Sequence, residues 1–176
     1  MFWGRMAIDS GTSEFYFSNG SIIQNLIHEL KYKGNRKVGI YLGNLMGTSL
    51  LNSNRFLIID MLVPLPLFEK KEFKRGYNQA MVLCEGIAQV MNLQIITKNV
   101  TRIVHTETQT KKGRRERWEN DEKSFTLKDP SGLSGKHILL GDDVITTGAT
   151  MEACGAEILK VKNARLSIAT FAFATR

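Results

Sequence analysis

Hydrophobic positions along the chain follow two periods, and together they predict an alternation of helices and strands. The helical period of about 3.6 residues predicts helices at 22–30, 38–51, 78–91 and 151–162. Short apolar runs or alternating positions predict strands at 14–17, 56–63, 93–96, 137–140 and 165–174. This order is typical of an α/β domain with a mostly parallel, twisted sheet flanked by helices.

Two polar segments interrupt this pattern. Residues 64–76 follow a predicted strand and contain Lys70 and Arg75, so we interpret them as a basic loop. Residues 105–123 have almost no apolar content and contain several basic residues, including Arg114 and Arg117. Such a segment does not bury enough apolar surface to order alone, and long polar loops inside domains are often lids. We therefore expect residues 105–123 to be a mobile lid that a ligand orders.

The most informative stretch is 137–150. An apolar run predicts a buried strand that stops at Asp142 and Asp143, and a small, hydroxyl-rich turn precedes the predicted 151–162 helix. The residues of that turn that carry the prediction are Thr146, Thr147, Gly148, Ala149 and Thr150. A strand, a tight loop and a helix together present free N–H groups and a positive dipole end to an anion.

Two acids beside a phosphate cradle suit a ligand that carries both a phosphate and a diol, such as ribose 5-phosphate. Carboxylates accept hydrogen bonds from hydroxyls and recruit Mg²⁺. The stretch lacks the Gly-Lys-Ser/Thr ending of a P-loop and the glycines of a dinucleotide fold. The alternative interpretation is a strand that ends in a solvated acidic turn.

Composition narrows the class of protein further. The 176 residues favour one domain, and the formal net charge of +7 favours polyanionic partners, either phosphorylated small molecules or nucleic acid. Only Cys84 and Cys154 are present, both on predicted apolar helix faces, so they cannot make a zinc site alone and they favour a reducing, cytoplasmic setting. No apolar run reaches the roughly 18 residues of a membrane span.

Residues 138–150 resemble the phosphoribosyl-pyrophosphate (PRPP) signature of type I phosphoribosyltransferases. They depart from it at Gly141, where that family usually has a bulky apolar residue, so we expect weaker packing behind the acids. With Val-Pro-Leu-Pro at 63–66, Arg-Gly-Tyr-Asn-Gln at 75–79 and Thr-Gln-Thr at 108–110, the chain is similar to the ComF family. These are bacterial, amidophosphoribosyltransferase-like proteins named for natural competence, and the similarity runs from about Phe2 to the C-terminus.

The family usually begins with a cysteine-rich zinc ribbon, which this chain lacks. We therefore expect residues 1–20 to be the remnant of a truncated N-terminal module.

The resemblance implies roles for particular residues. Asp142 and Asp143 would be the catalytic acids that hold the ribose hydroxyls, directly or through Mg²⁺, and residues 146–150 would bind the 5-phosphate. The pyrophosphate would meet the loop after the 56–63 strand and the lid, which corresponds to the family's mobile hood. The residues expected there are Pro64, Leu65, Lys70, Arg75, Arg114 and Arg117.

Two functions of different class stay open at this point. One is a Mg²⁺-dependent phosphoribosyltransferase that moves a phosphoribosyl group from PRPP to an unnamed acceptor, or the reverse. The other is a non-catalytic accessory protein of DNA uptake that binds single-stranded DNA and proteins of the competence machinery. The basic residues suit either function or a solvated surface. Asn78 suits a helix cap as well as a ligand contact, and Tyr77 suits the core as well as stacking on a ligand.

Overall fold

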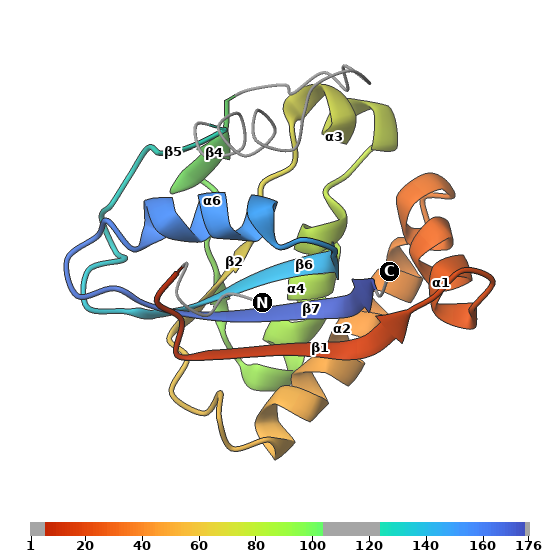
Figure 1. Ribbon diagram of the computed structural model, residues 1–176, viewed down its shortest axis with the longest axis horizontal. Helices are drawn as coiled ribbons and strands as arrows, with labels where there is room; N and C mark the ends of the chain where they lie inside the picture. Colours follow the sequence, from red (N-terminus) through yellow and green to blue (C-terminus); the bar gives the residue numbers. More distant parts are fainter. Residues whose placement is uncertain (1–5, 104–123, 175–176) are drawn as a thin grey trace.

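The computed structural model describes residues 6–103 and 124–174. Its centre is a five-stranded sheet in the order β1-β7-β6-β2-β3, in which every adjacent pair is parallel (Figure 1). The strands are β1 (Ser10–Phe17), β2 (Met61–Pro64), β3 (Gln94–Ile95), β6 (His137–Ile145) and β7 (Arg165–Ala174). The predicted parallel α/β sheet is therefore confirmed.

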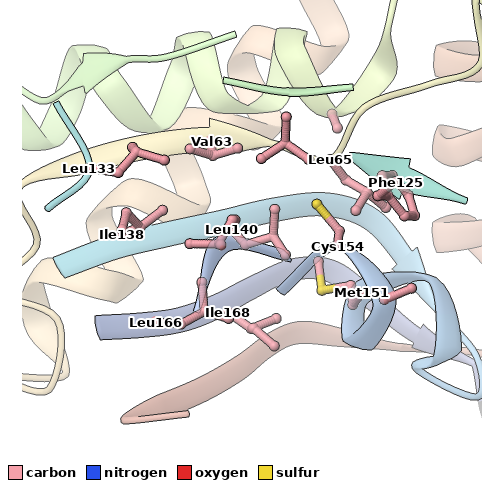
Figure 2. Packing of buried hydrophobic residues seen from close by; sticks show 14 of the residues in the cluster. Val63, Leu65, Phe125, Leu133, Ile138, Leu140, Met151, Cys154, Leu166 and Ile168 are labelled. Carbon is pink, nitrogen blue, oxygen red and sulfur yellow. The ribbon is translucent and has the colours of Figure 1, made fainter. Parts of the chain in front are cut away.

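Helices and a small ribbon cover the two faces of this sheet. On one face lie α1 (Ile22–Tyr32), α2 (Arg36–Asn52) and α4 (Gln79–Met91), which share a core with Leu62 and Leu139. On the other face lie α6 (Ala149–Ile158) and the antiparallel pair β4 (Val100–Arg102) and β5 (Phe125–Leu127). Figure 2 shows this second core, where Ile138, Leu140 and Ile168 of the sheet pack with Cys154 of α6. The arrangement is the type I phosphoribosyltransferase-like fold.

Local sequence signals explain several element boundaries. The Ser21 hydroxyl accepts a hydrogen bond from the Gln24 N–H at 3.1 Å and caps α1, as predicted. The helix α2 lies so close to α4 at Gly43 that a Cβ there would lie 2.2 Å from the Leu83 carbonyl oxygen. The predicted strand at 165–174 matches β7 at both ends.

Four predicted strands have different bounds in the structure, and the smallest difference is at β3, which is one residue shorter at each end than the predicted 93–96 strand. Strand β2 begins at Met61, because Phe56 and Ile59 are buried in the helical core instead of pairing in the sheet. Strand β6 does not stop at the acids but continues to Ile145, since its pairing with β7 extends through Asp142 and beyond. Strand β1 is longer than predicted, because it pairs with β7 from Ser10 to Phe17.

The segment interpreted as a basic loop contains a short helix, α3 (Glu69–Arg75). Glu69 and Glu72 lie in its first turn and Lys74 and Arg75 in its last, an order that favours a helix through its dipole. Gly76, at φ 82°, ends the helix, and its N–H donates to the Glu72 carbonyl at 2.7 Å. The predicted loop is wrong here, because acids in a first turn and bases in a last turn favour a helix.

The expectation of weak packing behind the acids was also wrong. A Cβ on Gly141 would lie 2.7 Å from the Sγ of Cys84, which is fully buried on α4. The thiol therefore occupies the volume that a larger side chain at 141 would need. Both cysteines are free and buried, and burial raises the pKa of each thiol.

The remaining predictions concern a membrane span and two segments of the chain. Among the helices that the structure describes, none has the length and apolar composition required to cross a bilayer. The expected mobile lid at 105–123, with Arg114 and Arg117, lies outside the described residues, and so do residues 1–5 of the expected N-terminal remnant.

Candidate functional site

A pocket lies beyond the carboxyl ends of β2 and β6, the usual position of ligand sites in parallel α/β sheets. Three parts of the chain form most of it: the segment after β2, the start of α4, and the end of β6 with the loop into α6. Its lining residues are Leu65, Pro66, Leu67, Arg75, Asn78, Gln79, Ala80, Arg102 and Asp142 through Met151.

The two acids in this pocket have different surroundings. The Asp143 side chain is buried, and its Oδ2 lies 2.9 Å from Nζ of Lys31, which α1 supplies. Asp142 is partly buried and has this carboxylate as its neighbour. Burial, followed by the negative charge of Asp143, raises the pKa of Asp142 well above its usual value. A cationic ligand group or a metal ion beside Asp142 would reverse this shift.

Backbone hydrogen bonds fix the orientation of both carboxylates. The Asp143 N–H donates to Oδ1 of Asp142 at 2.8 Å, and the Val144 N–H donates to Oδ1 of Asp143 at 2.8 Å. Each acid thus has one oxygen engaged with the chain. The second oxygen of Asp143 faces Lys31, so Asp142 is the acid better able to contact a ligand.

The loop 146–150 turns the chain from β6 into α6. Gly148 has φ 83°, a conformation that L residues rarely adopt, and it stands at the N-cap of α6. Gly148 has no side chain with which to cap the helix. The Ala149 N–H donates instead to the Thr147 hydroxyl at 3.4 Å. Thr146 and Thr147 are exposed. The arrangement leaves the positive end of the α6 dipole facing the pocket, where it favours an anion.

Two arginines also line the pocket. The Arg75 Nη1 donates to Oε1 of Gln79 at 2.7 Å, and the buried Gln79 amide donates to the Tyr77 carbonyl at 3.2 Å. Arg102 enters from β4, with its guanidinium 5.2 Å from the Phe125 ring centre. The pocket therefore has its acids and its arginines on separate elements, an arrangement that suits a ligand with hydroxyls at one end and phosphate at the other.

Asn78 connects two walls of the pocket. Its Oδ1 accepts from the Ala80 N–H at 3.0 Å and caps α4, and its Nδ2 donates to the Leu65 carbonyl at 3.0 Å. The cap that the sequence allowed is confirmed, and the same side chain holds the segment after β2 against α4.

Most of the residues predicted for this site line one pocket. These are Leu65, Arg75, Asp142, Asp143, Thr146, Thr147, Gly148, Ala149 and Thr150. Pro64 is instead buried as the last residue of β2, and Lys70 is exposed on α3.

Sequence reasoning missed three residues at the site: Lys31, Gln79 and Arg102. Lys31 and Arg102 are brought in by tertiary contacts that no local pattern signals, whereas Gln79 belongs to the Arg-Gly-Tyr-Asn-Gln block.

Comparison with known proteins finds relatives of this chain. No protein-family model matches the chain. The DNA utilization protein YhgH of Escherichia coli (strain K12) is 30% identical over 138 residues, which cover 77% of this chain and 60% of that protein. Competence protein F of Haemophilus influenzae is 31% identical over 93 residues, covering 52% of this chain and 41% of that protein. Competence protein ComFC of Bacillus subtilis (strain 168) is 36% identical over 111 residues, covering 63% and 42%.

The parallel sheet with helices on both faces is the fold of the type I phosphoribosyltransferase-like class. The relatives narrow that class further, and the chain belongs to the ComF family. It spans 60% of the length of the YhgH protein that it matches.

Proposed function

We propose that this chain acts in DNA utilization or competence, and that its pocket binds the phosphoribosyl part of a ligand such as PRPP or ribose 5-phosphate. The first half rests on the names of its relatives, all of which concern DNA utilization or competence. The second half rests on one observation: a single pocket gathers the two acids, the α6 loop and Arg75.

The proposed ligand would lie along the pocket in one orientation. The 5-phosphate would contact the N–H groups and threonine hydroxyls of 146–150, since these lie at the positive end of α6. The ribose hydroxyls would donate to Asp142, while Lys31 would hold the Asp143 carboxylate in position. A pyrophosphate would then extend toward Arg75 and Arg102, which line the same pocket.

The donor set also fits Mg²⁺. Within the described residues, no three His, Cys, Asp or Glu side chains are grouped as a metal cage. Mg²⁺ commonly takes one or two carboxylates and completes its octahedron with water and substrate phosphates. Asp142, with Asp143 behind it, would hold the ion, which would supply positive charge to the phosphates of the ligand. Its charge would also favour the ionised form of Asp142, whose pKa is otherwise raised.

Phosphoribosyl transfer is a second candidate, and Arg75 and Arg102 favour it. Transfer would break the bond between the anomeric carbon and pyrophosphate, so negative charge would grow on the leaving group. Preorganised cations at that end of a pocket stabilise such a transition state. The two arginines line the same pocket as the 5-phosphate loop, on α3 and β4.

Calorimetry on one protein sample tests both halves of the proposal. PRPP with Mg²⁺ should bind the wild-type chain, and Asp142→Ala with Asp143→Ala should abolish the Mg²⁺-dependent part of the affinity. Asp9→Ala is a matched control, because Asp9 is an acid paired with Arg165 away from the pocket. Equal affinity in wild type and double variant would rule out this pocket.

Single-stranded DNA titrated into the same sample tests the DNA half. Its affinity should fall with salt at a log–log slope of roughly −0.7 for each phosphate contacted. DNA binding that is absent at low salt would count against this half alone.

A further inference from the structure

The helix α3 has an exposed aromatic side chain that folding does not explain. Among the large hydrophobic residues that the structure describes, Phe73 is the most exposed, at 92%. None of the seven residues of α3 is buried, so this helix adds nothing to either core. Figure 1 shows α3 away from the sheet, at the top of the view. A single exposed phenylalanine is common on protein surfaces, so what matters is the chemistry that surrounds it.

Helical geometry places one lysine and one acid next to Phe73. Lys70 and Glu69 precede Phe73 by three and four residues, so both lie beside it on α3, whereas Lys74 lies about 100° further around the helix axis. Lys70, Phe73 and Lys74 are all exposed. The exposed side of α3 therefore combines an aromatic ring with two lysines, and Glu69 borders it.

A second exposed aromatic lies close to α3. Tyr32, in the last turn of α1, is 65% exposed, and the Arg75 guanidinium lies 5.7 Å from its ring centre. His28 lies one turn earlier, with its ring 4.8 Å from that of Tyr32. Because Arg75 also lines the pocket, it connects the Tyr32 ring to the proposed phosphate site.

Several basic residues lie near these two rings. Partial burial lowers the pKa of Lys71, and the positive charges of Arg102 and Arg75 lower it further. The nearby Lys33 and Arg36 are less available to a polyanion, since they contact Glu29 and Glu85 respectively. Among the described residues near the rings, the exposed lysines of α3 and Arg75 beside the pocket are available to a polyanion.

We propose that the surface made by Lys70, Phe73, Lys74, Arg75 and Tyr32 binds single-stranded DNA. Phe73 and Tyr32 would stack on unpaired bases, and the three basic residues would contact backbone phosphates. Stacking on aromatics beside a basic surface is how proteins hold single strands without reading their sequence. Paired bases in a duplex do not offer their faces in this way, so charge and aromaticity together favour the single strand.

This inference rests on the proposed function in DNA utilization and assigns a surface to it. It also implies competition, because Arg75 serves both the DNA surface and the pocket. PRPP bound in the pocket would weaken DNA binding, and DNA would weaken PRPP binding equally, since linkage is reciprocal.

Fluorescence anisotropy with a labelled 20-mer of dT tests the surface on the full chain. Phe73→Ala and Tyr32→Ala should each weaken binding by roughly 5- to 100-fold, the loss expected for one stacked base. Phe73→Trp and Tyr32→Phe retain the ring and should bind like the wild type. Lys74→Glu should weaken binding and make it less salt-dependent. Lys162→Glu, the same charge change before the start of β7, should have much less effect.

Three controls separate a loss of base stacking from a loss of folding, a change in the pocket and a general loss of phosphate binding. Thermal unfolding of Phe73→Ala should match the wild type, since this side chain is exposed, and its affinity for PRPP should be unchanged. A duplex of equal length should bind more weakly than dT and should not respond to Phe73→Ala. Equal loss with duplex and single strand would overturn the stacking role.

The outcomes also separate this inference from the function on which it rests. If the wild-type chain binds no dT at low salt, the proposed DNA function fails and the surface fails with it. If the wild type binds dT and the aromatic and lysine variants bind it equally well, only the surface is wrong. Salt-insensitive binding of dT that no variant weakens would point to another face of the molecule.

Discussion

The two edges of the sheet carry similar charged residues but use them differently. At the amino ends of the strands, charges pair with each other: Arg165 Nε donates to Asp9 at 2.7 Å, and Lys136 lies 3.5 Å from Asp60. The buried His137 contributes there as well, with Nε2 2.9 Å from the Ser167 hydroxyl. At the carboxyl ends, acids, arginines and helix dipole face a pocket instead. Charges paired within the protein stabilise the fold, whereas charges facing a pocket are available to a ligand.

Lys31 and Asp143 are the exception to this contrast, because they form an ion pair at the pocket edge, in which Asp143 is buried and Lys31 is partly buried. Lys31→Met should lower the free energy of unfolding by about 3 kcal/mol, since it leaves a buried carboxylate without its partner. Chemical denaturation measures this. Lys33→Met is the matched control, as its exposed contact with Glu29 is worth under about 1 kcal/mol. Equal effects of the two variants would mean that the Asp143 pair contributes no more than a surface pair.

Gly141 tests whether Cys84 takes the place of a larger side chain beneath the acids. Gly141→Ala should destabilise the fold by about 1–3 kcal/mol, because its Cβ would lie 2.7 Å from the Cys84 sulfur. Cys84→Ala should recover part of that loss in the double variant. Strictly additive effects in the double-mutant cycle would contradict direct packing between these two residues.

The amino-terminal edge should be sensitive to acid through His137. Burial, followed by the charge of Arg165, lowers the pKa of His137, so the folded state binds its proton less readily than the unfolded state does. Stability should therefore be full above the unfolded pKa of about 6.5 and should fall as the pH drops below it. Denaturation at pH 7.5 and 5.5 measures the effect. A His137→Gln variant should lose part of this pH dependence, and an unchanged profile would count against the assignment.

The smallest effect should come from Lys136 at the same edge. Both Lys136 and Asp60 have exposed side chains, so Lys136→Ala should change stability by less than about 1 kcal/mol. The change should shrink further in high salt, which screens exposed pairs. A loss comparable to that of Lys31→Met would show that burial does not separate the two pairs.

Local signals in the sequence predicted much of this structure. The helix caps at Ser21 and Asn78 are confirmed. The helix after the acidic strand is also present, although it begins two residues earlier and ends four residues earlier than the predicted 151–162. The apolar run at 56–63 was misleading because burial against helices and burial in a sheet require the same residue types. The predicted strand at 137–140 was shorter than β6, because strand pairing with β7 outweighs the polarity of Asp142.

The parts of the site that the sequence did not predict depend on tertiary contacts. Lys31 meets Asp143 only because α1 packs over the sheet near the end of β6. Arg102 lies on a three-residue strand whose partner, β5, comes after the undescribed segment. Neither the spacing nor the composition around these residues indicates such contacts. The acids and the phosphate loop, in contrast, are contiguous in the chain and could be found by pattern alone.

Hydrogen exchange with and without PRPP and Mg²⁺ tests the contrast between the two edges most directly. The account predicts slower exchange at the backbone amides of 146–150 and of the segment after β2 when the ligand is present. Amides at the amino ends of β6 and β7, around His137 and Arg165, should exchange at the same rate in both samples. Protection confined to the amino-terminal edge, or no protection at 146–150 under saturating ligand, would contradict the assignment of the pocket.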